Sequence, residues 1–372
     1  MSLREIADIA GVSVSTVSRV VNDKHRDKVS DETRARILEI ARSLRYRPNP
    51  QAVSLKTGRP SNTLGVLIPY FSHVFRSFYW SEISSGVLDA AYSHGVGVNM
   101  MVYRDDSEET FRELLSTYRN VSGVILLAVN GHASPAVEQC RNGMLPCVAV
   151  NSNGADPNVH SVDCDNRAGG YNATRHLIKL GHTRIAHIGG RDFSDAHERL
   201  KGYRDALEEA GIPIDERLIV GGNFEETGGR EAMRTLLSGS PRPSAVFAAN
   251  DDSAIGAMSA AKRAGLRIPD DLAVVGFDDI SVAQYVEPAL TTVHQPIYRM
   301  GYRAAEMLIG RLQANEGRNG AAIARDIVHT RLVIRESCGG RRANGHEDMS
   351  IARPADPAPL SGEETPWKSQ RL

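Results

Sequence analysis

The pattern of apolar and polar residues changes once along the chain, close to residue 62. Before that point apolar residues recur every three or four positions, which predicts short amphipathic helices. After it, short apolar runs such as 64–68, 124–127 and 273–277 alternate with amphipathic stretches such as 200–210. This alternation of strands and helices predicts parallel sheets that carry helices on both faces. The sequence therefore predicts an α/β protein with a small helical head and a large core.

The head is expected to contain three short helices. Ser2 can cap the first helix, and Glu5 stands three residues later, where it completes a capping box. Gly11 permits a tight turn, after which Ser13 and Ser30 can cap the second and third helices. Two short helices around a turn, braced by a third, are typical of a helix-turn-helix module.

The α/β part of this 372-residue chain spans about 275 residues, which is too long for one comfortable sheet domain and predicts two similar lobes. The expected parts are a helix-turn-helix head at 1–47, a hinge helix and linker at 48–62, a two-lobed core at 63–338 and a tail at 339–372. The expected lobes are an N-lobe at 63–163 and 293–322 and a C-lobe at 164–292 and 323–338. The tail lacks apolar periodicity, so we expect it to be disordered.

Charge is distributed unevenly, although the net charge of the chain is only −1. Residues 1–60 carry 12 basic and 7 acidic side chains, whereas the remaining 312 residues carry 32 basic and 38 acidic ones. A basic head on an acidic body is typical of a protein in which only the head meets phosphate. The four cysteines form no C-x-x-C pair, and the N-terminus has no basic-then-apolar signal pattern. We therefore expect a cytoplasmic protein with no membrane partner.

The string from Leu3 to Asn22 (LREIADIAGVSVSTVSRVVN) closely resembles the headpiece of the lac repressor family (LacI/GalR), and the resemblance continues to residues 46–49. It implies that the second helix enters the major groove of double-stranded DNA. Six residues separate Asn22 from Val29, which is more than is usual in the family. The implied DNA contacts in the head are Ser13, Val14, Ser15, Thr16, Ser18, Arg19 and Asn22.

The roles of these residues follow from their chemistry and their place in the motif. Val14 and Ser15 stand where the family reads base edges, and Arg19 can bond guanine bidentately. Thr16 and Ser18 suit phosphate oxygens. From the residues alone, Ser13 could be only a helix cap and Arg19 only a solvated surface charge.

The segment from Pro50 to Thr57 looks like the hinge helix of the family. A helix of about eight residues is marginal in water, so we expect it to fold only when it pairs with its twin from a second subunit in the minor groove. The resemblance places Leu55 as an apolar wedge at a central base step, with Ala52 and Lys56 beside it. The alternative is that Leu55 packs over the linker. The hinge implies a homodimer on a pseudopalindromic operator.

The core resembles the same family and the related periplasmic sugar-binding proteins. The strings that carry this resemblance lie at 165–166, 199–207, 249–252, 275–279 and 290–295. They imply that a small effector is held by four polar side chains, Arg199, Asn250, Asp278 and Gln295. A carboxylate with a guanidinium or an amide can hold the neighbouring hydroxyls of a sugar through charge-assisted hydrogen bonds.

Aromatic side chains are expected to form one wall of the same site. Six of them fall within eleven residues, namely Tyr70, Phe71, Phe75, Phe78, Tyr79 and Trp80. Aromatic faces stack on sugar rings, so Tyr70 and Tyr79, with Phe224 from the other lobe, join the expected effector site. Local core packing is an equal alternative for Phe75 and Phe78. Asn151 and Asp195 match galactose-responsive members, which suggests galactose or a related hexose as the effector.

Three classes of function are to be weighed for this sequence: a regulator, an enzyme and a transport binding protein. A regulator fits the head and the core together, whereas an enzyme on an α/β scaffold would need a phosphate-binding, nucleotide-binding or nucleophile motif that the sequence lacks. A transport binding protein would not need the DNA-binding head. His176, His182 and His187 lack metal-site spacing, so we expect no metal and no cofactor. The prediction is a dimeric repressor of sugar genes, released from DNA by its effector.

Overall fold

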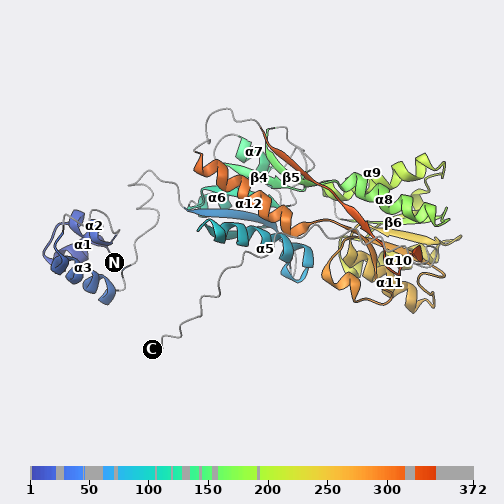
Figure 1. Cartoon of the computed structure of the whole chain (residues 1–372), viewed down its shortest axis with the longest axis horizontal. Coiled ribbons are helices and arrows are strands. Elements are labelled where there is room, and N and C mark those ends of the chain that lie inside the picture. The colour runs from blue at the N-terminus through green and yellow to red at the C-terminus, as the bar shows by residue number, and fades with distance from the viewer. Residues whose placement is uncertain are drawn as a thin grey trace. The chain divides into compact units, whose positions relative to one another are not determined.

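The computed structural model describes residues 2–21, 29–44, 46, 62–70, 74–104, 107–118, 120–127, 135–141, 145–152, 158–190, 193–314 and 323–340. Its contacts divide the chain into a small unit at residues 1–63 and 119–122 and a large unit formed by the rest. Figure 1 labels the helices and strands of both units. The head within the small unit and the core formed by the large unit are described separately.

The head is a bundle of three helices, as the sequence predicted: α1 (Leu3–Ala10), α2 (Val14–Val21) and α3 (Asp31–Ser43). Ser2 and Glu5 form the expected capping box, and Gly11 ends α1 in a left-handed conformation with φ 63°. The Ser13 hydroxyl accepts a hydrogen bond from the Thr16 backbone N–H at 3.2 Å, which caps α2. Buried aliphatic side chains from all three helices close the centre of the head, chiefly Ile6, Val17 and Ile37.

The N-lobe of the core is a six-stranded sheet in the order β11-β5-β4-β3-β1-β2. Its strands are β1 (Thr63–Pro69), β2 (Gly97–Tyr103), β3 (Gly123–Leu127), β4 (Cys147–Val150), β5 (His160–Cys164) and β11 (Arg325–Val328). Its helices are η2 (Val74–Arg76), α5 (Phe78–Ser93), α6 (Glu108–Thr117), α7 (Pro135–Arg141) and α12 (Ile297–Gln313). Strands β1, β3, β4, β5 and β11 pair in parallel, and α5 packs against α12.

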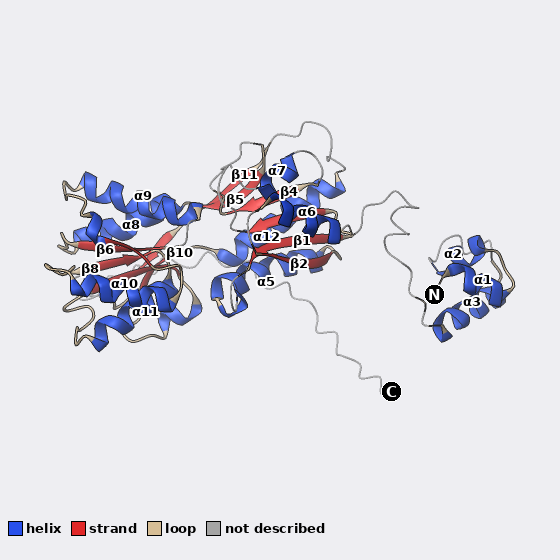
Figure 2. Ribbon diagram, turned by 180° about the vertical axis from the view of Figure 1, so that it is seen from behind, coloured by secondary structure: helices blue, strands red, loops and turns tan. Residues whose placement is uncertain are grey.

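The C-lobe repeats this plan with the order β12-β10-β9-β8-β6-β7. Its strands are β6 (Ile185–Gly189), β7 (Ile219–Gly221), β8 (Ala245–Ala248), β9 (Ala273–Asp278), β10 (Thr291–His294) and β12 (Arg331–Val333). Its helices are α8 (Asn166–Lys179), α9 (Ser194–Glu209), η4 (Glu216–Leu218), α10 (Glu226–Ser238), α11 (Asp251–Arg263) and η5 (Ser281–Gln284). Figure 2 shows helices flanking the sheet of each lobe, which explains why β8 and β9 are buried along their whole length.

The chain crosses between the lobes three times, and two of the expected lobe boundaries are wrong. Strand β10 extends to His294 in the C-lobe sheet, so the N-lobe does not resume at residue 293. Strand β11 pairs in parallel with β5, so residues 325–328 complete the N-lobe sheet instead of joining the C-lobe. Only β12 returns to the C-lobe, where it pairs antiparallel with β10. Strands of three or four residues carry too little periodicity to be assigned to a sheet from sequence.

Helix pairs within the lobes pack at short range because glycines face the partner backbone. A Cβ atom at Gly202 of α9 would lie 2.0 Å from the Arg167 carbonyl oxygen of α8. A Cβ atom at Gly301 of α12 would lie 2.1 Å from the Ile83 carbonyl oxygen of α5. Any side chain at these two positions would therefore push the helices apart. None of the described helices is both long and apolar enough to cross a membrane.

Candidate functional site

The start of α2 presents a small group of hydroxyls beside an exposed apolar residue. The Ser13 hydroxyl lies 2.8 Å from that of Ser15 and 2.9 Å from that of Thr16. Val14 is 43% exposed, whereas Val17 one turn later is fully buried. Donors, acceptors and one apolar side chain are therefore displayed at a helix N-terminus, which suits contact with base edges and phosphates.

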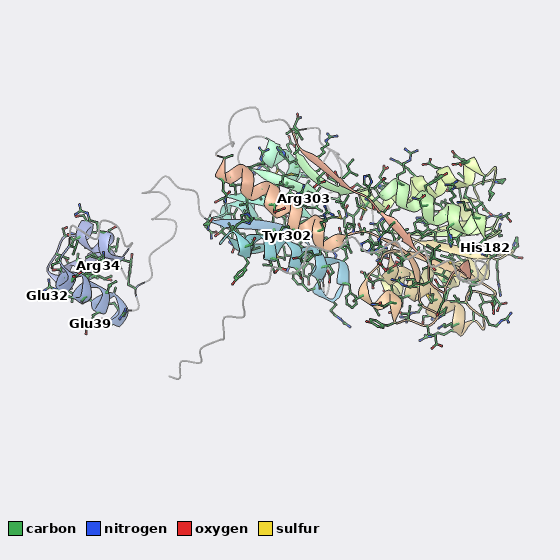
Figure 3. All side chains as sticks on the ribbon, in the orientation of Figure 1. Glu32, Arg34, Glu39, His182, Tyr302 and Arg303 are labelled. Atoms are coloured by element: carbon green, nitrogen blue, oxygen red, sulfur yellow. The ribbon has the colours of Figure 1, made fainter. Side chains whose placement is uncertain are left out.

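The other residues expected to contact DNA differ in their exposure to solvent. Arg19 is exposed on the last turn of α2 and is available to a partner. Ser18 is only 7% exposed, because it lies beside the core residue Val17, so little of its hydroxyl is left for phosphate. The exposed side of α3 carries charges of both signs, with Glu32 and Glu39 (Figure 3) beside Arg36 and Arg42. Four expected DNA contacts lie outside the described residues, namely Asn22, Ala52, Leu55 and Lys56.

The candidate effector site is built around Arg199 of α9, whose side chain is almost completely buried. Its Nε donates to the Asn166 Oδ1 at 2.9 Å, and its Nη1 donates to the Ala249 carbonyl oxygen at 2.6 Å. Its guanidinium carbon lies 3.8 Å from the centre of the Phe277 ring. The guanidinium is therefore fixed on three sides before any ligand arrives.

Two carboxylates and one amide surround this guanidinium. The Asp278 Oδ1 lies 3.4 Å from the Arg199 Nη1 and accepts a hydrogen bond from the Gln295 Nε2 at 2.6 Å. The Asp195 Oδ2 lies 3.5 Å from the Arg199 Nη2. Burial raises the pKa of Asp278 to about 7, although Arg199 and Gln295 both act to lower it. The structure thus brings together four of the expected effector residues, Asp195, Arg199, Asp278 and Gln295.

The N-lobe contributes Asn151 and Tyr79 to the same region. The Asn151 Nδ2 donates to the Tyr79 hydroxyl at 2.7 Å, and the Asn151 carbonyl oxygen accepts from the Ser194 hydroxyl of the C-lobe at 2.7 Å. Burial raises the pKa of Tyr79, and the negative charges of Asp195 and Asp278 raise it further. Through Asn151, the Tyr79 hydroxyl of the N-lobe is therefore linked to Ser194 at the start of α9.

Asn250 and Phe224 are joined to each other. The Asn250 Oδ1 accepts from the Ser253 backbone N–H at 3.0 Å and so caps α11, while its Nδ2 donates to the Phe224 carbonyl oxygen at 3.1 Å. Phe224 stacks on Phe193 at 6.4 Å and lies 5.8 Å from the Arg199 guanidinium. Both polar atoms of Asn250 are thus engaged within the protein, which makes it a support for Phe224 in this state.

The aromatic wall expected after the first core strand is only partly formed. Tyr70 is 56% exposed and lies beneath the Arg104 guanidinium, and no hydrogen bond links its side chain to Arg199 or Asp278 among the described residues. Phe75 and Phe78 are exposed at 50% and 40%, whereas Trp80 is buried. Phe71 lies outside the described residues. Of this run, Tyr79 is tied to the candidate site by its hydrogen bond with Asn151.

Two buried polar atoms of the cluster have no hydrogen-bond partner among the described residues, namely the Arg199 Nη2 and the Gln295 Oε1. One is a donor and the other is an acceptor, and both side chains are about 1% exposed. A buried polar atom without a partner is costly, so this pair indicates a place where a ligand completes the hydrogen bonding. Asn166, which orients Arg199, was not expected as a site residue, although it lies in one of the family-like strings.

Comparison with known proteins agrees with both parts of the chain. Residues 2–49 match the family model of bacterial regulatory proteins, lacI family, and residues 174–338 match that of the periplasmic binding protein-like domain. The HTH-type transcriptional repressor CytR of Escherichia coli (strain K12) is 34% identical over 90% of this chain and 96% of its own.

Two solved structures extend the comparison. The transcriptional regulator CelR–cellobiose complex is 34% identical, with a TM-score of 0.69 over 91% of this chain and 99% of its own. The lac repressor dimer bound to operator and the anti-inducer ONPF is 26% identical, with a TM-score of 0.75 over 91% and 98%. These relatives are regulators and not enzymes, so the enzyme alternative is set aside. The chain belongs to the lacI family of bacterial regulatory proteins and is a DNA-binding transcriptional regulator.

Proposed function

We propose that this regulator binds a neutral, polyhydroxylated effector, a sugar of hexose size or a close relative, between Arg199 and Gln295. The observation that carries the proposal is that the Arg199 Nη2 and the Gln295 Oε1 are both buried and make no hydrogen bond among the described residues. A hydroxyl group both donates and accepts, so one hydroxyl or two neighbouring hydroxyls would satisfy both atoms. Asp278, Asp195, Asn151, Tyr79 and Phe224 would complete the site.

The charges around the site favour a neutral ligand over a phosphorylated or carboxylated one. Arg199 already faces the carboxylates of Asp195 and Asp278. An anionic ligand would have to approach these buried carboxylates without a second cation to offset them, and like charges in a buried site repel strongly. The cellobiose complex of the similar regulator supports a sugar as the ligand class.

The effector would act by changing the relative position of the two lobes. The site takes residues from both lobes, and the Ser194–Asn151 hydrogen bond already joins them. A ligand that prefers one closure angle would shift the lobes and, through the hinge at 48–62, change the affinity of the head for DNA. Typical allosteric coupling is about 1–3 kcal/mol. We infer that a homodimer binds a pseudopalindromic operator at the cytoplasmic nucleoid and represses sugar genes, and that the effector releases it.

A panel of sugars tests the proposed site. Galactose, glucose, ribose and cellobiose would each be added to the purified full chain while its melting temperature is measured. We expect one class of sugar to raise the melting temperature of the wild type, and to raise that of Gln295→Leu much less. Tyr70→Ala is the matched control and should respond as the wild type does. Equal stabilisation of the wild type and Gln295→Leu would contradict the site.

A further inference from the structure

The turn at the end of β9 is strained, and it begins at Asp278, the central carboxylate of the proposed effector site. Asp278 has a φ of 112° and Asp279 a φ of 59°, so two consecutive residues with side chains adopt left-handed conformations. Such conformations cost free energy and persist only where neighbouring contacts hold them. Contacts on both sides of the turn hold it in this conformation.

On its outer side, the turn is held through Asp279. The Asp279 Oδ1 accepts from the Arg335 Nη2 at 2.6 Å, and its Oδ2 lies 3.0 Å from the His294 Nδ1. These contacts lower the pKa of Asp279 despite its partial burial. They fix the second residue of the turn but do not reach Asp278.

On its inner side, the turn is held by Asp251, the first residue of α11, which is completely buried. The Asp251 Oδ2 accepts from the Ile280 backbone N–H at 2.9 Å, and its Oδ1 accepts from the Thr292 hydroxyl at 2.5 Å. One carboxylate thus joins the N-terminus of α11, the turn after β9 and strand β10. Both of its oxygens are engaged within the protein, so Asp251 is not itself a ligand for an effector.

Strand β9 makes room for this carboxylate. A Cβ atom at Gly276 would lie 2.2 Å from the Asp251 Oδ1, so any side chain there would displace Asp251. Gly276 stands two residues before Asp278 on the same strand. The buried side chain of Asp251 therefore fits only because residue 276 is a glycine.

We propose that Asp251 is a positioning residue, which holds the β9 turn so that Asp278 meets Arg199 and Gln295 before an effector binds. Its importance for regulation rests on the proposed function of Asp278. Its geometry, in contrast, is tested without any effector. A sugar panel without a hit would therefore leave this test intact.

The Gln295 side-chain amide reports the position of Asp278, because its Nε2 donates to the Asp278 Oδ1. The full chain would be labelled with 15N-glutamine, and the Gln295 amide signal assigned by its loss in Gln295→Leu. Backbone exchange of the other residues would be followed by mass spectrometry. In Asp251→Asn, the side chain keeps one acceptor oxygen in place of two, so the Ile280 N–H and the Thr292 hydroxyl can no longer both donate to it. We expect hydrogen exchange of the Gln295 amide and of residues 278–283 to accelerate about tenfold or more, and exchange in β8 to stay unchanged.

Two further variants make the result decisive. Asp252→Asn removes the neighbouring carboxylate, which makes no hydrogen bond to the turn among the described residues, and it should exchange as the wild type does. Thr292→Val keeps the Asp251 carboxylate and removes one of its two donors, so it should show a smaller acceleration in the same places. If Asp251→Asn does not fold, the exchange rates of Thr292→Val alone test the proposal. Lower melting temperatures with wild-type exchange at Gln295 and the turn would overturn the proposal.

Discussion

The guanidinium carbon of Arg199 lies over the Phe277 ring, 3.8 Å from its centre, while the Ala249 carbonyl oxygen accepts from its Nη1. A cation over an aromatic face gains energy when both are removed from water. The Nη2 of Arg199 makes no hydrogen bond among the described residues and lies 3.5 Å from the Asp195 Oδ2, so it is the nitrogen of Arg199 that can still donate to a ligand. The site is thus organised in advance around one available donor.

Replacing Arg199 tests how much of the C-lobe depends on this arrangement. Arg199→Met would leave the Asp278 and Asp195 carboxylates without their cation, and breaking a buried pair costs about 3–5 kcal/mol. The free energy of unfolding, measured by urea denaturation, should fall by that order. Arg267→Met is the control, because Arg267 is 72% exposed and its pair with Asp271 should contribute at most about 1 kcal/mol. Equal losses in the two variants would contradict this account of Arg199.

His187 should make the fold sensitive to acid. Burial lowers its pKa to about 4, and its Nδ1 lies 3.1 Å from the Phe247 carbonyl oxygen. The unfolded chain therefore binds a proton between pH 6.5 and 4 that the folded chain does not. Stability contributed by His187 should be full above pH 6.5 and fall by about 3 kcal/mol towards pH 4.

The comparison that isolates this effect is His187→Asn, which keeps a donor for the Phe247 carbonyl oxygen but cannot be protonated. Denaturation at several pH values should show a smaller acid loss in this variant than in the wild type. The raised pKa of Asp278 gives the opposite slope, because its folded form keeps a proton that the unfolded form releases. Since Asp278 is present in both proteins, its slope cancels in the difference. Parallel pH profiles would exclude His187 as the acid-sensitive group.

The head offers a matched pair of valines on one helix. Val17 is fully buried, so Val17→Ala should destabilise the head by about 2 kcal/mol and raise hydrogen exchange across α1, α2 and α3. Val14 is 43% exposed, so Val14→Ala should leave exchange unchanged and alter the preferred DNA sequence instead. Exchange mass spectrometry and selection of DNA fragments separate the two effects. A wild-type sequence preference in Val14→Ala would remove Val14 from the base-reading set.

Two helix glycines, Gly202 of the C-lobe and Gly310 of the N-lobe, should respond to alanine in opposite ways. Gly202→Ala would place its Cβ 2.0 Å from the Arg167 carbonyl oxygen and should destabilise the protein by about 1–3 kcal/mol as α8 and α9 separate. Gly310→Ala meets nothing within 4 Å on α12 and should stabilise it by about 0.5–1 kcal/mol, because alanine favours the helix. Thermal unfolding of both variants measures whether each substitution raises or lowers the stability of the protein. A stabilising Gly202→Ala would show that the helices can separate freely.

Features that depend on local pattern could be predicted from the sequence. The capping box of Ser2 and Glu5 and the buried strand expected at 273–277 follow from short-range spacing; the structure has both, and the strand extends one residue further, to Asp278. The pairing of β11 with β5 could not be predicted, because it joins residues about 160 positions apart through a four-residue strand. The roles of Asn250 as a cap and of Asn166 as the partner of Arg199 depend on side-chain direction, which residue type alone does not fix.

The most direct test of a regulator controlled by an effector is selection of genomic DNA fragments on the purified full chain, followed by sequencing, with and without the sugar that stabilises the core. Salt must be held near physiological concentration, because non-specific phosphate binding changes steeply with it. We expect one pseudopalindromic sequence to be enriched, and its affinity to fall by about 5- to 150-fold when the sugar is present. No enriched sequence from a folded protein under either condition, or an operator affinity that the bound sugar leaves unchanged, would contradict this mechanism.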